Sequence, residues 1–306
     1  MVSAQSLLSQ LSALGIRPKK GLGQNFLVDP AHRARIVAAA DLTSDDVVLE
    51  VGPGPGVLTE LIAQQAGRVI AVELDNRLIP FLRQRFADQP HVTIVHGDIL
   101  KLDAGRLMLE AVGQGPEAIS DLQPVTRQLQ PSTFNLHYKV IANLPYYITS
   151  AVIRHLLESN PSPELLVLTV QREVAERMVA SPPNMSLLAL GVQFYCTAQI
   201  VGRIPAGAFF PQPKVDSAVV RLARRKQLVA VDVDPAEVFQ VARAGFGQPR
   251  KQLRNSLAAG LGLPAAAAER WLTEAGIAPQ RRAETLSLEE WVLLARTRPE
   301  PLPTAR

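Results

Sequence analysis

Five short runs of apolar residues constrain the fold of this chain more than any other feature of its sequence. They cover residues 47–51, 69–73, 92–95, 138–142 and 165–170, and turn residues bound them. The runs are nearly continuous in apolar residues, and most of the stretches between them carry the periodicity of a helix. Strands of this kind are typical of a parallel sheet covered by helices on both faces. The sequence therefore predicts a doubly wound, Rossmann-like α/β domain.

A second, smaller domain is expected toward the end of the chain. Two later runs, at residues 193–201 and 217–222, predict an antiparallel pair that ends the sheet. From residue 235 onward the pattern predicts helices at residues 235–245, 250–260, 265–275 and 288–296. We therefore expect a sheet domain over residues 1–225 and a small all-helical domain over residues 230–306. Within the first, residues 104–134 mix Gly and Pro with polar residues, which predicts a surface insert.

Composition narrows the class of protein. The chain has 306 residues, a net charge of +4 and one cysteine, Cys196, which cannot form an internal disulfide. No apolar run is long enough to cross a membrane, so we expect a cytoplasmic protein without a membrane contact, with an organellar leader left open. Three clusters of basic residues together favour a polyanionic partner. They are Arg17, Lys19 and Lys20; Arg221, Arg224, Arg225 and Lys226; and Arg250, Lys251 and Arg254.

A glycine-rich loop follows the first apolar run. It extends from Glu50 to Thr59 and opens a helix, so its backbone can approach a ligand at the carboxyl edge of the sheet. Counted from Gly52, the sixth position is Val57, where a dinucleotide-binding fingerprint has glycine, and the loop has no lysine of the kind found in a phosphate loop. We therefore expect Gly52 to contact a nucleotide-like ligand that lacks a pyrophosphate.

Acidic residues end the next two strands. Glu73 ends the run 69–73, where its carboxylate can accept both hydrogens of a ribose diol. Asp98 follows the run 92–95, where it can accept a hydrogen bond from an adenine amino group. Either acid alone could be a helix cap or a solvated strand end. Their placement on successive strand ends favours an adenosine site.

The fourth strand leads into Asn143-Leu144-Pro145-Tyr146, a segment with a chemical rationale. An adenine amino nitrogen is a poor nucleophile because its lone pair is delocalised into the ring. The Asn143 side-chain oxygen and the Leu144 carbonyl can each accept one amino hydrogen and so favour a pyramidal nitrogen, while Pro145 fixes the turn. Tyr146 can stack on the base, whereas the neighbouring Tyr147 is expected to be buried packing.

A second aromatic pair, Phe209 and Phe210, precedes a Pro-rich segment, and one of the two can close the other face of the base. No Cys or His nucleophile is needed for transfer from a good leaving group. Cys196 is expected in the core. The five histidines show no ligand spacing, so no metal is predicted.

Taken together, these motifs resemble the ribosomal RNA adenine N6,N6-dimethyltransferase family, in particular the bacterial small-subunit dimethylase, along nearly the whole chain. The matching segments are Lys20-Gly-Leu-Gly-Gln-Asn25-Phe-Leu27, the Gly52 loop, Glu73-Leu-Asp75, Gly97-Asp98, Asn143-Leu-Pro-Tyr146, Phe210-Pro-Gln-Pro-Lys-Val-Asp216-Ser217, Arg250-Lys-Gln-Leu-Arg-Asn255 and Arg282-Ala-Glu-Thr-Leu-Ser-Leu-Glu289.

The resemblance implies a methyltransferase sheet that uses S-adenosyl-L-methionine and releases S-adenosyl-L-homocysteine. It implies cofactor contacts from Asn25, Leu27, Gly52, Glu73, Asp98 and Asn143, and a catalytic site of Asn143, Leu144, Pro145, Tyr146 and Phe210. It further implies that the substrate is the assembling small ribosomal subunit, in which two adjacent adenines near the 3′ end of the RNA each receive two methyl groups. We expect the enzyme to act as a monomer, with the helical domain binding the RNA.

Two departures and three alternatives accompany this reading. The spacing from Asp98 to Asn143 is longer than in the family, and the extra residues coincide with the expected insert. The segment at residues 181–190 is shorter and less basic than the corresponding segment of the family.

A DNA adenine methyltransferase would use the same catalytic segment, and a ribosome-assembly factor of the same ancestry would have lost catalysis. The intact site motifs argue against the assembly factor. A nicotinamide oxidoreductase fails on Val57.

Overall fold

The computed structural model describes residues 4–13, 15–113, 136–227, 229 and 232–299. The chain divides into two compact units, which are treated separately below. The sheet unit comprises Met1–Ala175 and Ala198–Arg224, and the helical unit comprises Glu176–Thr197 and Arg225–Arg306. Among the described residues, no helix is long and apolar enough to cross a membrane.

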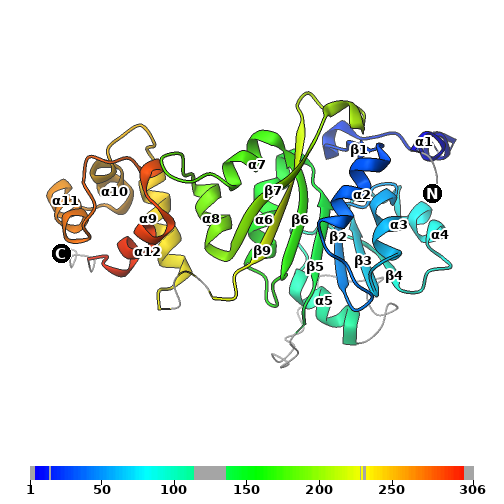
Figure 1. The fold of residues 1–306 in the computed structure, drawn as a ribbon, viewed down its shortest axis with the longest axis horizontal. Helices are drawn as coiled ribbons and strands as arrows, with labels where there is room; N and C mark the ends of the chain where they lie inside the picture. The colour runs from blue at the N-terminus through cyan, green and yellow to red at the C-terminus, as the bar shows by residue number, and fades with distance from the viewer. Residues whose placement is uncertain (1–3, 14, 114–135, 228, 230–231, 300–306) are drawn as a thin grey trace. The chain divides into compact units, whose positions relative to one another are not determined.

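The core of the sheet unit is a seven-stranded sheet in the order β4-β3-β2-β5-β6-β9-β7 (Figure 1). Its strands are β2 (Val47–Val51), β3 (Arg68–Glu73), β4 (Val92–His96), β5 (Lys139–Asn143), β6 (Leu165–Gln171), β7 (Cys196–Ile204) and β9 (Ser217–Arg224). Strands β2 to β6 are parallel to one another, and β9 runs antiparallel to β6. Consecutive residues of β2, β3 and β6 are buried, so both faces of the sheet are covered. The predicted doubly wound α/β fold is confirmed.

The strand order indicates where in the sheet a ligand can bind. From β2 the chain moves outward to β3 and β4, and then returns to place β5 and β6 on the other side of β2. In open α/β sheets, ligands bind at the carboxyl ends of the strands where the order reverses in this way. The helices of this unit that surround the sheet are α2 (Pro30–Ala38), α3 (Val57–Ala63), α4 (Ile79–Arg85), α5 (Ala104–Gly113) and α6 (Thr149–Leu157). Helix α1 (Ala4–Ala13) precedes them, and α7 (Arg172–Met178) follows β6.

The predicted surface insert at residues 104–134 begins in the wrong place. Residues 104–113 form helix α5, in which Ala104, Leu107, Met108 and Ala111 are buried. Their spacing of three and four residues is that of the inner face of a helix, which the nearby Gly and Pro residues obscured in the sequence. The rest of the expected insert, residues 114–134, lies outside the described part of the chain.

The run at residues 193–201 was predicted as a strand, but its first residues belong to a helix. Helix α8 (Leu187–Tyr195) ends directly where β7 begins at Cys196. The boundary was invisible because α8 is almost entirely apolar, so its pattern does not distinguish a buried helix from a buried strand. Strands β7 and β9 do lie side by side at the end of the sheet, as expected.

The helical unit packs α8 with α9 (Pro235–Phe246), α10 (Leu253–Leu261), α11 (Ala265–Glu274) and α12 (Leu288–Arg296). Asp234 caps α9, and Ser287 caps α12 in a capping box with Glu290. Residues 176–197 belong to this unit because Leu190 and Phe194 of α8 join its core, where the Phe194 ring lies 5.4 Å from that of Phe239 on α9.

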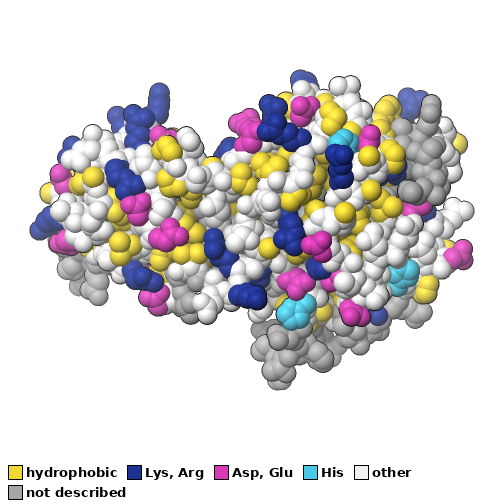
Figure 2. Space-filling view, viewed as in Figure 1, with side chains coloured by type: hydrophobic (Ala, Val, Ile, Leu, Met, Phe, Trp, Pro, Cys, Tyr) yellow, Lys and Arg dark blue, Asp and Glu magenta, His cyan; other side chains and the backbone are white. Residues whose placement is uncertain are grey.

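Some basic residues of the predicted clusters form ion pairs with acidic residues of their own unit. Arg221 pairs with Asp41 at 3.3 Å, and Arg254 pairs with Glu269 at 3.2 Å. In the turn between α9 and α10, by contrast, Arg250 and Lys251 are exposed. On the face drawn in Figure 2, Lys and Arg side chains are interspersed with Asp and Glu. The α9–α10 turn therefore presents two neighbouring basic side chains to solvent.

Candidate functional site

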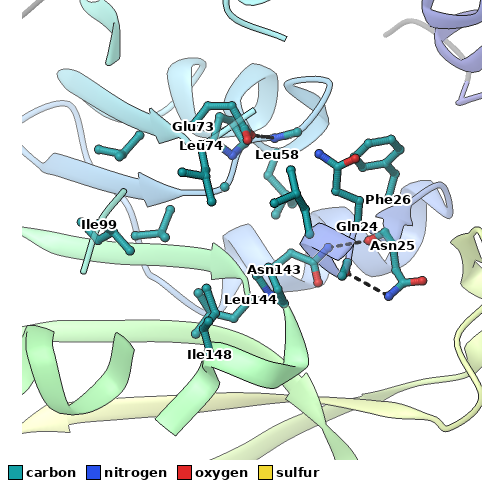
Figure 3. Close-up of a pocket in the computed structure, with 18 of the residues that line it drawn as sticks. Gln24, Asn25, Phe26, Leu58, Glu73, Leu74, Ile99, Asn143, Leu144 and Ile148 are labelled. Atoms are coloured by element: carbon teal, nitrogen blue, oxygen red, sulfur yellow. Dashed lines mark hydrogen bonds between the residues drawn. The ribbon is translucent and has the colours of Figure 1, made fainter. Parts of the chain in front are cut away.

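A pocket opens at the carboxyl ends of β2, β3 and β5, where the strand order reverses (Figure 3). Nine of the ten predicted site residues line it: Asn25, Leu27, Gly52, Glu73, Asp98, Asn143, Leu144, Pro145 and Tyr146. The structure thus brings together segments that are more than a hundred residues apart in the sequence.

The loop between β2 and α3 forms the floor of the pocket. Gly52 has a φ of +70°, a conformation that side-chain-bearing residues rarely adopt. A Cβ atom added to Gly52 would meet no protein atom within 4 Å, although the residue lines the pocket. The space above this backbone is therefore open, as a cradle for a closely approaching ligand requires.

Glu73, at the end of β3, is 5 % exposed, and burial raises the pKa of its carboxyl group. Its oxygens accept backbone N–H groups from Gly54 at 3.0 Å and from Asp75 at 2.8 Å. These bonds fix the carboxylate against the glycine loop. Since each oxygen has a second lone pair, the group can still accept two hydroxyl hydrogens from a sugar.

Apart from Glu73, this part of the pocket has one acidic residue, Asp98, among apolar lining residues. Asp98 follows β4, and its Oδ1 accepts the N–H of Leu100 at 3.1 Å. Leu74, Ile99 and Leu58 line the pocket together with it, and Figure 3 shows Leu74 and Leu58 close to Glu73. We did not single out these apolar residues from the sequence. Their signal was available, because Leu74 and Ile99 directly follow the two strand-end acids.

Asn143 ends β5, and its side-chain amide is oriented by the N-terminal part of the chain. The Nδ2 group donates to the backbone carbonyl of Asn25 at 3.0 Å (Figure 3). A carbonyl oxygen can only accept, so the nitrogen end of the amide must face Asn25 and Oδ1 must be the other end. The site therefore contains a hydrogen-bond acceptor held in one orientation.

The two tyrosines after Pro145 have opposite environments. Tyr146 is partly buried, and its hydroxyl lies 2.8 Å from Oγ of Ser217; burial raises the pKa of this phenol. Tyr147 is 62 % exposed at the mouth of the pocket. The expectation that Tyr147 is buried packing was wrong, because the short 3₁₀ turn Tyr146–Ile148 directs its ring outward.

The pair Phe209–Phe210 divides in the same way. Phe209 is 4 % exposed and belongs to the sheet core, whereas Phe210 is 47 % exposed. Phe210 in β8 (Phe209–Phe210) pairs with Phe26 in β1 (Phe26–Leu27), and Phe26 lines the pocket. Phe210 itself is the one predicted site residue that is not among the lining residues. Of the two rings, only that of Phe210 is available to a base.

Among the described residues, no group of three or more His, Cys, Asp or Glu side chains is arranged to hold a metal ion. Cys196 is buried, as expected. The chemistry of the pocket is thus that of hydrogen-bond acceptors, backbone groups and aromatic rings.

Comparisons with known proteins agree on one family. The family model described as "Ribosomal RNA adenine dimethylase" matches residues 15–297. A protein named ribosomal RNA small subunit methyltransferase A from Dehalococcoides mccartyi is 47 % identical over 279 residues, which cover 91 % of this chain and 88 % of that protein. A protein of the same name from Pelotomaculum thermopropionicum is 44 % identical and covers 92 % of this chain and 91 % of its own length.

Solved structures show the same fold. The 23S rRNA methyltransferase ErmE matches with a TM-score of 0.63 and 27 % identity over 89 % of this chain and 99 % of its own. A dimethyladenosine transferase from Plasmodium falciparum matches with a TM-score of 0.66 over 88 % of this chain and 95 % of its own; at 24 % identity, it supports the fold alone.

Proposed function

Because this chain belongs to the ribosomal RNA adenine dimethylase family, we propose that it dimethylates N6 of two adjacent adenines near the 3′ end of small-subunit ribosomal RNA. The enzyme class and the use of S-adenosyl-L-methionine follow from the family. The observation that carries the proposal is the orientation of Asn143, whose Nδ2 is held by Asn25 so that Oδ1 remains as an acceptor for an amino group.

The pocket fits S-adenosyl-L-methionine. The open space above Gly52 and the fixed carboxylate of Glu73 suit an adenosine whose ribose hydroxyls bind the acid. Asp98 would accept a hydrogen bond from the adenine amino group of the cofactor. Asn25, Leu27 and Asn143 would also contact the cofactor. When bound, the cofactor supplies a methyl group on a positively charged sulfonium, and S-adenosyl-L-homocysteine leaves.

The chain itself prepares the nucleophile. In the first transfer, Oδ1 of Asn143 and the backbone carbonyl of Leu144 each accept one hydrogen of the target amino group, which localises the nitrogen lone pair and aims it toward the cofactor side. The methylated nitrogen then loses one proton to solvent, so a single N–H is left for these acceptors in the second transfer. Pro145 holds the turn that places both acceptors. Correct placement of two reacting groups lowers the barrier without a covalent intermediate on the protein, so no nucleophilic side chain is required.

Stacking supports extraction of the base. Tyr146, fixed through its hydroxyl to Ser217, and Phe210 are the rings proposed to sandwich the target adenine. Base–aromatic stacking contributes on the order of 1–3 kcal/mol per base, which is comparable to the cost of unstacking a nucleotide. Two rings can therefore offset that cost.

The relatives named above favour RNA as the acceptor, and the readings as a DNA adenine methyltransferase or a silent assembly factor are not favoured. We propose a monomer that works in the cytoplasm on the assembling small subunit.

A competition experiment tests the acceptor. The protein would be incubated with isotopically labelled S-adenosyl-L-methionine and unmethylated small subunits, naked ribosomal RNA and duplex DNA. Label in ribosomal RNA supports the proposal. Label in DNA alone would overturn the substrate, and tight subunit binding without label would favour the assembly factor.

A further inference from the structure

One wall of the pocket comes from a segment that precedes the sheet. Residues 17–27, here called the N-terminal segment, contribute Leu22 to Leu27 to the lining. Part of the segment is anchored by the pairing of β1 with β8, and by Val28, whose N–H donates to the Ala208 carbonyl at 2.8 Å. These contacts hold only the C-terminal end of the segment. The part before Phe26 is held by a different set of contacts.

That set centres on Asp75, two residues beyond Glu73. Asp75 is 2 % exposed, and its Oδ2 accepts a hydrogen bond from Nε2 of Gln24 at 3.0 Å. Arg77 donates to both carboxylate oxygens, at 2.6 and 2.9 Å, and Nζ of Lys19 lies 3.6 Å from Oδ1. The hydrogen bonds from Arg77, followed by that from Gln24, hold the pKa of Asp75 well below its usual range. The carboxylate is thus a charged anchor for the segment.

Further bonds fasten the segment to the same point. Oε1 of Gln24 accepts the backbone N–H of Lys19 at 2.7 Å, so one Gln24 side chain joins both the segment and the anchor. A guanidinium nitrogen of Arg77 donates to the carbonyl of Arg17 at 3.2 Å. Removal of the Gln24 side chain therefore weakens the attachment of the segment without disturbing the Asp75–Arg77 pair.

The segment connects the two halves of the site. Asp75, to which Gln24 of the segment is bonded, donates its N–H to Glu73, the proposed ribose acceptor. The carbonyl of Asn25, the residue after Gln24, accepts a hydrogen bond from the amide of Asn143. The acceptor for the target base is therefore oriented only while the segment is seated.

We infer that Gln24 and Asp75 are positioning residues that latch the N-terminal segment over the pocket and so couple cofactor binding to the orientation of Asn143. The inference rests on the proposed function, because it assigns the coupling to S-adenosyl-L-methionine and adenine. A ligand that contacts the seated segment stabilises it, and the seated segment in turn orients Asn143. By linkage, cofactor binding and acceptor binding strengthen each other by the same factor.

The test uses the full chain with Gln24→Leu, and with Gln84→Leu on the exposed side of α4 as the matched control. S-adenosyl-L-homocysteine affinity is measured by calorimetry, seating of the segment by hydrogen exchange of the amides of residues 19–25, and turnover on ribosomal RNA by kcat and KM. Loss of a hydrogen bond to a charged group corresponds to roughly a tenfold effect. We expect Gln24→Leu to bind the probe about tenfold more weakly, to exchange faster and to lose kcat, with the thermal midpoint of the control and the variant unchanged.

A double variant that exchanges the amide and the carboxylate between positions 24 and 75 distinguishes a positioning role from a purely structural one. Gln24→Glu alone places two carboxylates in contact and should be worse than Gln24→Leu. Adding Asp75→Asn restores an amide–carboxylate bond with the roles exchanged, and should recover part of the probe affinity and of kcat. Such recovery supports a latch, because a purely structural role for Asp75 predicts additive losses.

Other outcomes overturn the inference. It fails if Gln24→Leu leaves probe affinity, exchange and kcat unchanged, or if the variants lower only the thermal midpoint. Should wild-type protein show protection of residues 19–25 by S-adenosyl-L-homocysteine, lost in Gln24→Leu, but no methyl transfer to ribosomal RNA, the latch would stand and the proposed acceptor would fall.

Discussion

Glu50 is a carboxyl group almost completely removed from water. It is 1 % exposed, Oε2 accepts the hydroxyl of Thr59 at 2.6 Å, and burial raises its pKa from 4.5 to about 8. Between these two values the folded protein holds a proton that the unfolded chain releases. The free energy of unfolding therefore falls as pH rises through this range.

Glu50→Gln removes this titration while keeping the shape of the side chain. The free energy of unfolding of the variant, relative to wild type, should rise by on the order of 3 kcal/mol between pH 5 and 8 and then level off. Urea unfolding of both proteins at pH 5, 6.5 and 8.5 measures the difference. A difference that does not change with pH would show that Glu50 does not titrate in this range.

We predict that the exposed ring of Tyr147 stacks on a nucleotide beside the target. Because it is 62 % exposed, Tyr147→Ala should change the free energy of unfolding by less than about 0.5 kcal/mol. Loss of one base–aromatic stack should raise KM for ribosomal RNA about tenfold at saturating cofactor. Tyr147→Phe keeps the ring and is the matched control. Equal KM values for the Ala and Phe variants would exclude this contact.

At the residue scale, the polar residues predicted from the sequence line one pocket, whereas the expectation for one of the aromatic residues was wrong. Glu73, Asp98 and Asn143 could be placed because each ends or follows a strand, and parallel strands end at one edge. The orientation of Tyr147 depends on a single 3₁₀ turn, and the burial of Phe209 depends on its partner Leu27 across a two-residue pairing. Neither leaves a periodic signal in the sequence.

The turn between α9 and α10 is the element that presents unpaired basic residues most clearly. Arg250 and Lys251 are exposed there, beside a groove lined by Arg243 and Gln248. If they contact RNA phosphates, the variant carrying Arg250→Ala and Lys251→Ala should bind ribosomal RNA more weakly whatever its sequence.

Salt dependence checks this directly. The slope of log affinity against log salt concentration should decrease by about 1 to 2 in the double variant, since each lost phosphate contact releases fewer counterions. The variant carrying Arg154→Ala, exposed on α6 and paired with Glu158, is the control. An unchanged slope in the double variant would place the RNA elsewhere.

The boundaries of helices and strands could be predicted from the sequence where the pattern of apolar residues was unambiguous. Strand β2 and helix α12 occur at the predicted residues because each has a clear pattern and a clear stop. Helix α5 was missed because Gly113 and the Gly and Pro residues that follow it suggested a loop, and α8 because an almost entirely apolar helix has no polar face to reveal its period. In both cases packing decided the structure where the local pattern was ambiguous.

At the scale of the whole molecule, the two units give separate signals. The chain contains two tryptophans, and both, Trp271 and Trp291, are buried in the core of the helical unit. The proposed cofactor pocket lies in the sheet unit. Units with their own cores can unfold independently.

S-adenosyl-L-homocysteine should therefore raise the midpoint of unfolding followed by far-UV circular dichroism, by mass action on the sheet unit, and leave the tryptophan fluorescence midpoint nearly unchanged. Equal shifts in both signals would mean that the units unfold as one.

The extent of the helical unit was hard to predict from sequence because residues 176–197 join it across a long gap in the chain, through the apolar face of α8.

We propose that Asn143 prepares adenine N6 for methyl transfer in this pocket. The measurement is single-turnover formation of N6,N6-dimethyladenosine in unmethylated small subunits, by wild type and by Asn143→Ala, with S-adenosyl-L-homocysteine affinity determined for both. We predict dimethyladenosine with the wild type, and a rate lower by roughly a hundredfold or more in the variant, with probe affinity changed only a few-fold. A variant as fast as wild type, or a wild type that forms no dimethyladenosine, would contradict the account.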